Sequence, residues 1–176
     1  KFLGFDIFIR RSNDLRKDIN GKTIRSLGHV PVLYLNYETM RKKLFDYKAA
    51  RIAVENGKEI WKSIVRTYMI DLDDLEIVSQ FNAEIRGFYN YYSIANNSPA
   101  INSFYHIMSY SMYKTFARKY KSSVKKILFQ YKKDGTFKVA YENSKGKTLY
   151  QSFYHDGFKR KKIAGATSCD TIPRTV

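Results

Sequence analysis

Two long amphipathic helical patterns, separated by Ser98-Pro99, constrain the fold of this chain more than any other feature of its sequence. Helical residues advance by about 100° each, and the apolar positions of each pattern then fall on one face. After Asp74 these positions are Val78, Phe81, Ile85, Phe88, Tyr89 and Tyr92. After Ser98, as a predicted N-cap, and Pro99, at the first helical position, they are Ile101, Phe104, Tyr105, Met108, Met112, Tyr113 and Phe116. We expect two helices packed together.

Shorter patterns lie on either side of this pair. On the N-terminal side we expect a strand or tight hairpin in residues 1–10, a turn at Asn20-Gly21, an extended segment from Val30 to Tyr37 and a short helix from Glu38 to Tyr47. Residues 48–70 contain a turn signal at Asn56-Gly57, and a second apolar face is formed by Ile60, Trp61, Ile64, Val65 and Tyr68. After Asp134-Gly135 the period changes to two, which predicts a β-hairpin with a turn in residues 143–147.

Four acidic residues open the first long helix: Asp71, Asp73, Asp74 and Glu76. Carboxylates this close in sequence could hold a metal ion. We favour the alternative that they cap the helix, since acidic side chains accept bonds from free N–H groups and meet the positive end of the helix dipole.

The net charge of +16 is concentrated in one part of the chain. Residues 98–176 hold 16 basic and 4 acidic side chains, which is +12 of the total. Such a field attracts polyanions; nucleic acid is the favoured partner and a membrane surface the alternative. No segment approaches the roughly 18 apolar residues of a membrane span, so we expect no insertion.

Two sets of polar side chains are candidate nucleic-acid contacts. One recurs every three or four residues beside the first apolar face: Ser79, Asn82, Arg86, Asn90, Ser93 and Asn97. Amide, hydroxyl and guanidinium groups suit phosphates, sugars and base edges, although a helix packed against a polar neighbour would also fit. The other is a basic stripe, formed if one helix continues through Ser122-Ser123: Lys114, Arg118, Lys121, Lys125 and Lys132.

The sequence contains no recognisable catalytic site. His29, His106 and His155 stand alone, without metal-ligand spacing to Cys169, and no phosphate-binding loop or nucleophile motif is present. The single cysteine excludes an internal disulfide, and nothing indicates secretion. Because the chain opens with Lys1 and an apolar run, we expect a piece of a larger protein, cut within a structural element.

Residues 77–92 read IVSQFNAEIRGFYNYY and resemble the maturase signature of group II intron-encoded proteins, which are reverse transcriptases that also help their intron to splice. The matching positions are Phe81, Asn82, Ile85, Arg86, Gly87, Asn90, Tyr91 and Tyr92. Residues 2–5 look like the last reverse-transcriptase motif, and residues 111–120 look like a further family helix through Thr115, Ala117, Lys119 and Tyr120. The resemblance covers roughly residues 1–133, and beyond them it is a looser likeness to the family's DNA-binding segment.

The resemblance implies a mainly α fold. A helical thumb bundle, also called domain X, would occupy residues 38–121, after the end of the polymerase palm in residues 1–37. A basic DNA-binding segment, made of a small helix and a β-hairpin, would occupy residues 122–176. The thumb of the family grips template–primer and binds intron RNA, and the last segment contacts target DNA during intron mobility. The catalytic motif and its Mg²⁺ belong to the parent polymerase, so we expect no catalytic residue, metal site or cofactor in this chain.

The partners implied are group II intron RNA, target DNA and the rest of the reverse transcriptase, without a membrane, in a bacterial cytoplasm or an organelle. The predicted RNA-binding residues are Ser79, Asn82, Arg86, Asn90, Asn97, Lys114, Arg118, Lys121 and Lys125. The predicted DNA-binding residues are Lys132, Lys133, Lys159, Arg160, Lys161 and Lys162. Two alternatives stay open: a basic structural or protein-interaction domain, and a maturase whose parent only splices.

Overall fold

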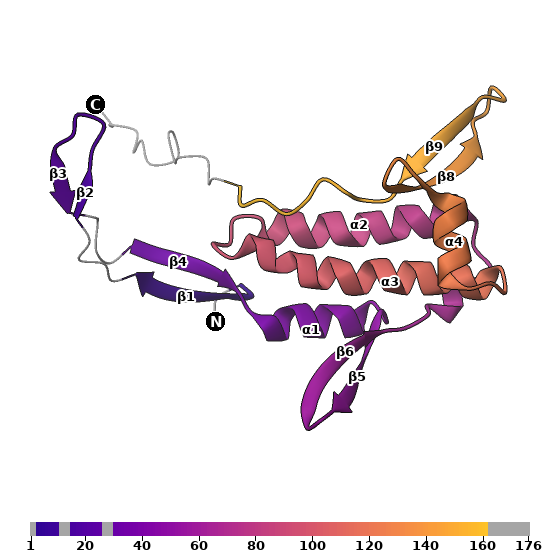
Figure 1. The fold of residues 1–176 in the computed structure, drawn as a ribbon, viewed down its shortest axis with the longest axis horizontal. Coiled ribbons are helices and arrows are strands. Elements are labelled where there is room, and N and C mark those ends of the chain that lie inside the picture. The colour runs from indigo at the N-terminus through magenta and orange to yellow at the C-terminus, as the bar shows by residue number, and fades with distance from the viewer. Residues whose placement is uncertain (1–2, 11–14, 26–29, 162–176) are drawn as a thin grey trace, which may run out of the picture.

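Two antiparallel helices form the centre of the molecule, α2 (Asp74–Tyr92) and α3 (Ile101–Lys119). The two helices lie side by side (Figure 1). The structure is a computed structural model, and it describes residues 3–10, 15–25 and 30–161. Both predicted helices are confirmed. Ser98 is not an N-cap, because it lies in a 3₁₀ turn (Ser98–Ala100) before α3 and its hydroxyl donates to the carbonyl of Phe158 at 3.2 Å.

The core lies where α2 and α3 face each other. Phe81 and Ile85 of α2 and Met108 of α3 are fully buried, and the rings of Phe88 and Phe104 stack with centroids 4.2 Å apart. At the start of α2, the backbone N–H of Asp73 and the side chain of Glu76 complete a capping box. Asp73 and Glu76 therefore cap the helix, whereas the carboxylate of Asp74 accepts bonds from the Lys119 ammonium and the Tyr120 hydroxyl, both at 2.7 Å. Among the described residues, no group of three or more His, Cys, Asp or Glu side chains could hold a metal ion.

The N-terminal residues form small antiparallel sheets at one end of the helices. Strand β1 (Phe5–Arg10) pairs with β4 (Val30–Leu35), and β2 (Leu15–Lys17) pairs with β3 (Thr23–Arg25). Phe5 packs on Tyr91 and Tyr92 at the end of α2, with ring centroids 5.7 Å and 5.0 Å away. Phe5, from the segment that resembles the last reverse-transcriptase motif, is thus in direct contact with the maturase-like signature of α2. Helix α1 (Tyr37–Asp46) follows β4 and packs on α3, as Figure 1 shows.

The expectation of a mainly α fold is wrong. In the described part of the chain, nine strands accompany four α-helices, so the fold is mixed α/β. The clearest departure is the hairpin of β5 (Ala50–Glu55) and β6 (Lys58–Ser63), where the second apolar face was expected. Asn56 and Gly57 both have positive φ, 51° and 73°, which is the two-residue turn that matches the twist of a hairpin. This turn chemistry outweighs the helical spacing of Ile60 and Trp61.

Helix α3 does not continue through residues 120–123. It ends at Lys119, Lys121 has a φ of 46°, and α4 (Val124–Tyr131) begins after Ser123, whose hydroxyl accepts a bond from the N–H of Lys126 at 3.3 Å. The basic stripe on a single helix face is therefore wrong. Its cations are distributed over α3, the turn, α4 and a strand.

The predicted C-terminal hairpin is confirmed as β8 (Thr136–Glu142) and β9 (Thr148–Ser152), with the short β7 (Lys132–Lys133) added at the edge of β8. Phe137 and Val139 point to the core. After β9 the chain returns along α2, as the yellow segment in Figure 1 shows. We call residues 153–161 the strap. Its aromatic side chains Phe153, Tyr154 and Phe158 are buried. In the described residues, no helix is long and apolar enough to cross a membrane.

Candidate nucleic-acid interface

The exposed ridge of α2 carries the side chains that are available to a partner. Its solvent-facing residues are Ser79, Gln80, Ala83, Arg86, Gly87, Asn90 and Tyr91. Arg86 and Asn90 lie one turn apart, so both face the same side of the ridge. The strap passes on that side, and Gly87 and Tyr91 face the other side, toward α1.

A pocket of about 350 Å³ lies between this ridge and the strap; its lining residues are Arg86, Tyr89, Asn90, Tyr154, Asp156, Gly157 and Lys161. We call it the strap pocket. The ammonium of Lys161 is 3.3 Å from the Asn90 Oδ1 and lies 5.1 Å from the centre of the Tyr89 ring. Arg86 and Lys161 outnumber the single carboxylate of Asp156 in this lining, and two cations beside an amide donor can bind a phosphate. The structure thereby joins two predicted RNA-binding residues, Arg86 and Asn90, with a predicted DNA-binding residue, Lys161.

The strap is fixed at several points along α2. Within the strap, the hydroxyl of Tyr154 donates to the carbonyl of Gly157 at 2.8 Å, and burial raises the pKa of this hydroxyl to about 12. The hydroxyl of Tyr89 donates to the carbonyl of Lys159 at 2.7 Å, and the N–H of Lys161 bonds to the carbonyl of Ser93 at 2.8 Å. The cation at the strap pocket is therefore held in place before any ligand binds.

Two of the predicted RNA-binding asparagines have internal partners. Asn82 is 2% exposed; its amide donates to the Ser152 carbonyl and accepts from the Tyr154 N–H, both at 2.8 Å. Asn97 makes the same pair of bonds to the backbone of Leu35, at 2.9 Å and 2.7 Å. Each side-chain amide thus makes the pair of backbone hydrogen bonds that a neighbouring β-strand would make. Asn82 attaches the strap to the middle of α2, and Asn97 attaches β4 to the turn after α2. The hydroxyl of the buried Ser93 donates to the carbonyl of Asn90.

A second basic pocket, about 410 Å³ in volume, lies at the junction of α3 and α4. Its lining includes Lys114, Arg118 and Lys121, with Val65 and Val124 as apolar walls. The Lys114 ammonium donates to the Ser63 carbonyl at 2.7 Å. Burial lowers the pKa of this ammonium, and the positive charges of Arg51 and Lys62 lower it further. The break after α3 thus gathers three of the predicted cations in a concave site. We call it the junction pocket.

The other predicted cations lie farther along the chain and face solvent. They are Lys125 on α4, Lys132 and Lys133 on β7, and Lys159 and Arg160 in the strap. The guanidinium of Arg160 also donates to the Ile94 carbonyl at 3.2 Å, and Lys133 lies 5.4 Å from the centre of the Tyr150 ring. Lys162 lies outside the described residues. Every nucleic-acid contact of these side chains, and of those in the two pockets, stays a prediction.

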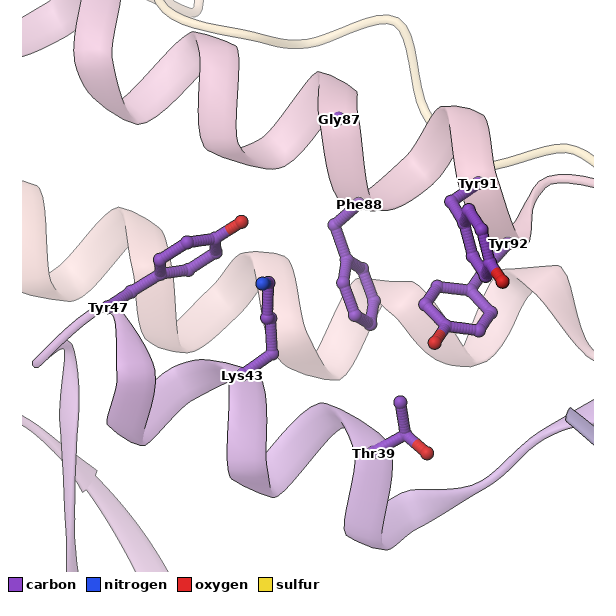
Figure 2. A pocket seen from close by; sticks show the side chains of 7 residues that line it. All are labelled: Thr39, Lys43, Tyr47, Gly87, Phe88, Tyr91 and Tyr92. Atoms are coloured by element: carbon purple, nitrogen blue, oxygen red, sulfur yellow. The ribbon is translucent and has the colours of Figure 1, made fainter. Parts of the chain in front are cut away.

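A third pocket, of about 360 Å³, lies on the other side of the α2 ridge and is drawn in Figure 2. The side chains of α1 and α2 point toward each other across it. Its lining residues are Thr39, Lys43, Tyr47, Gly87, Phe88, Tyr91 and Tyr92. Four of these residues belong to the maturase-like signature, so that signature lines pockets on both sides of its helix. We call this one the α1–α2 pocket.

Sequence reasoning missed one ion pair that positions α2. Arg66 is 1% exposed; its guanidinium lies 2.7 Å from a Glu84 carboxylate oxygen and 4.1 Å from the centre of the Phe81 ring. Arg66 lies just before a 3₁₀ turn (Thr67–Met69), where the sequence has no helical periodicity. No sequence pattern therefore indicated that Arg66 is buried. Glu84 offered a signal, because it lies next to the apolar face of α2, three residues after Phe81.

Residues 34–166 match the family model of the type II intron maturase. The chain is 35% identical over 148 residues to the group II intron-encoded protein LtrA of Lactococcus lactis subsp. cremoris, and equally to the protein of that name from strain MG1363. These alignments cover 84% of this chain and 24% of each relative. The chain therefore spans about a quarter of the length of the relatives that it matches.

Proposed function

This chain belongs to the type II intron maturase family, and from that premise we propose that it binds the RNA of a group II intron and promotes splicing of that intron. The observation that carries the proposal is the strap pocket. It combines Arg86 and Asn90 of the signature helix with Lys161, a cation held from a distant part of the sequence.

The proposed mechanism is stabilisation of folded RNA. A protein that binds the folded form of an RNA but not its unfolded form shifts the equilibrium toward the folded form. The strap pocket takes its cations from α2 and the strap, and the junction pocket takes its cations from α3 and the turn after it. Two phosphates held in these two pockets would fix the relative position of two RNA segments, which is what an intron needs to reach its splicing-competent structure.

We propose two finer roles for the same chain within a longer parent. Helices α1, α2 and α3 would form the thumb that grips template–primer, and α4 with β7–β9 would contact target DNA. The exposed cations Lys125, Lys132 and Lys133 support the second role, since backbone contacts supply most of the sequence-independent affinity for DNA. Polymerase chemistry and its Mg²⁺ would belong to the remaining length of the parent.

Filter binding with a group II intron transcript at two salt concentrations tests the main proposal. We expect Arg86→Ala and Lys161→Ala each to lower affinity several-fold and to reduce the salt slope by about 1. Lys58→Ala, an exposed cation at the β5–β6 hairpin, is the charge-matched control. Unchanged binding by both variants, or equal binding of an unrelated structured RNA by the wild type, would favour a basic structural or protein-interaction domain.

A further inference from the structure

We propose that the α1–α2 pocket holds one unpaired base of the bound RNA, and that Gly87 keeps the mouth of this pocket open. The inference rests on the proposed function and specifies how the RNA would be read. The fold itself does not explain why residue 87 is a glycine.

Gly87 lies in the interior of α2, where glycine stabilises a helix less than any other residue except proline. Its φ is not in the left-handed region, and a Cβ added to it would meet no described heavy atom within 4 Å. Neither backbone conformation nor packing therefore requires a glycine. The missing side chain leaves space only for something outside the described fold.

Gly4 shows the contrast. Its φ is +80°, and a Cβ there would lie 2.5 Å from the hydroxyl oxygen of Tyr92. Both the backbone and the neighbouring ring explain that glycine. Gly87 has neither reason, although it stands five residues before the same tyrosine. A close approach of a ligand to the helix backbone is the remaining physical reason for glycine at an exposed position.

The walls of the pocket suit a nucleobase. Tyr91, which is 51% exposed, and the half-buried Tyr47 supply aromatic surface above the buried rings of Phe88 and Tyr92. Thr39 and Lys43 supply a hydroxyl and an ammonium group (Figure 2). None of the lining residues carries a carboxylate. A volume of about 360 Å³ lies near the lower end of the roughly 300–1,000 Å³ of ligand pockets. Unstacked RNA bases commonly bind by stacking on aromatic side chains beside a basic surface.

The two sides of the ridge fit neighbouring parts of one strand. Arg86 and Asn90 face the strap pocket, whereas Gly87 and Tyr91 face the α1–α2 pocket. Each residue of one side is followed in sequence by a residue of the other. A strand that crosses the ridge can therefore place a phosphate beside Arg86 and a base beside Gly87. Single-stranded RNA fits this arrangement because its bases are not already paired.

The test uses Gly87→Ala and Gly87→Leu, with Ala83→Leu as the control, since Ala83 is exposed on the same ridge one turn earlier and lines neither pocket. The probes are a single-stranded RNA of about 12 nucleotides, its fully paired duplex, and single-stranded DNA of the same sequence. We expect Gly87→Ala to raise Tm by about 2–4 °C, because it improves helix propensity without a clash. Affinity for the single-stranded RNA should fall about 5-fold for Ala and more than about 10-fold for Leu, with duplex binding unchanged.

The outcomes separate the two proposals. If Arg86→Ala weakens RNA binding but Gly87→Leu does not, the base pocket is overturned and the proposed function stands. If neither variant changes RNA binding, both are overturned. An equal loss from Ala83→Leu would show that bulk anywhere on the ridge matters, which also overturns the pocket. A loss confined to single-stranded DNA would overturn it in favour of a DNA site.

Discussion

Helix α2 and the segment from α4 to β7 carry polar side chains in opposite ways. On α2, Asn82 is buried against the strap and Arg86 borders a pocket whose other cation arrives from residue 161. On α4 and β7, Lys125, Lys132 and Lys133 all face solvent, and beside them Phe129 is 92% exposed. Helix α2 thus lines a pocket with polar side chains, whereas α4 and β7 carry exposed lysines. We infer that α2 supplies selectivity and the α4–β7 segment supplies affinity.

The difference follows from packing. Helix α2 contacts α3 on one side and the β8–β9 hairpin on another, so its polar groups must find partners in the protein or lie on the narrow ridge between. Helix α4 lies at the end of the bundle, and only Ile127 of its eight residues is buried. Four of its eight side chains are exposed to water: Lys125, Lys126, Phe129 and Gln130.

The largest expected effect tests the interior side of α2. Glu84→Ala leaves the buried guanidinium of Arg66 without its ionic partner, which should lower the free energy of unfolding by about 3–5 kcal/mol in a urea titration. The double variant Arg66→Met with Glu84→Leu removes both charges and should recover most of that loss. A loss below about 1 kcal/mol in the single variant would show that the pair does not stabilise the packing of α2.

A smaller effect is expected where α2 holds the strap. Asn82→Ala leaves the Ser152 carbonyl and the Tyr154 N–H without partners, which should cost about 2 kcal/mol of stability. The strap should loosen with it, so the Tyr154 amide should exchange its hydrogen faster and RNA affinity should fall as Lys161 leaves the pocket. Ser79→Ala, on the exposed ridge, is the matched control and should stay within about 0.5 kcal/mol. Unchanged hydrogen exchange at Tyr154 would contradict the role assigned to Asn82.

The smallest change in stability is expected in the α4–β7 segment. The double variant Lys132→Ala with Lys133→Ala removes two exposed cations and should alter the free energy of unfolding by no more than about 1 kcal/mol. Its salt slope for duplex DNA should decrease by about 2, with a smaller change for intron RNA. If RNA binding falls as much as DNA binding, the division between a selective α2 and a charged α4–β7 segment is wrong.

The candidate site was predictable only in part. Periodicity located α2 and α3, and the same periodicity placed Asn82 and Arg86 in one polar row. Periodicity could not tell that Asn82 is buried and Arg86 exposed, because it gives the direction of a helix face and not the segment that packs on that face. The strap covers Asn82 and leaves Arg86 in solvent. The residues that cover one helix face lie some seventy positions away in sequence, between Ser152 and Lys161.

The sequence by itself determined the two central helices, the C-terminal hairpin, the excess of positive charge and the resemblance to the maturase signature. These features are local, since they depend on the spacing of apolar residues, on turn residues and on composition. Only the tertiary structure decided the ion pair of Arg66 with Glu84, the pocket that gathers Lys114, Arg118 and Lys121, and the meeting of Arg86 with Lys161. Pockets and buried pairs arise from contacts between distant segments, and a pattern within one segment does not contain them.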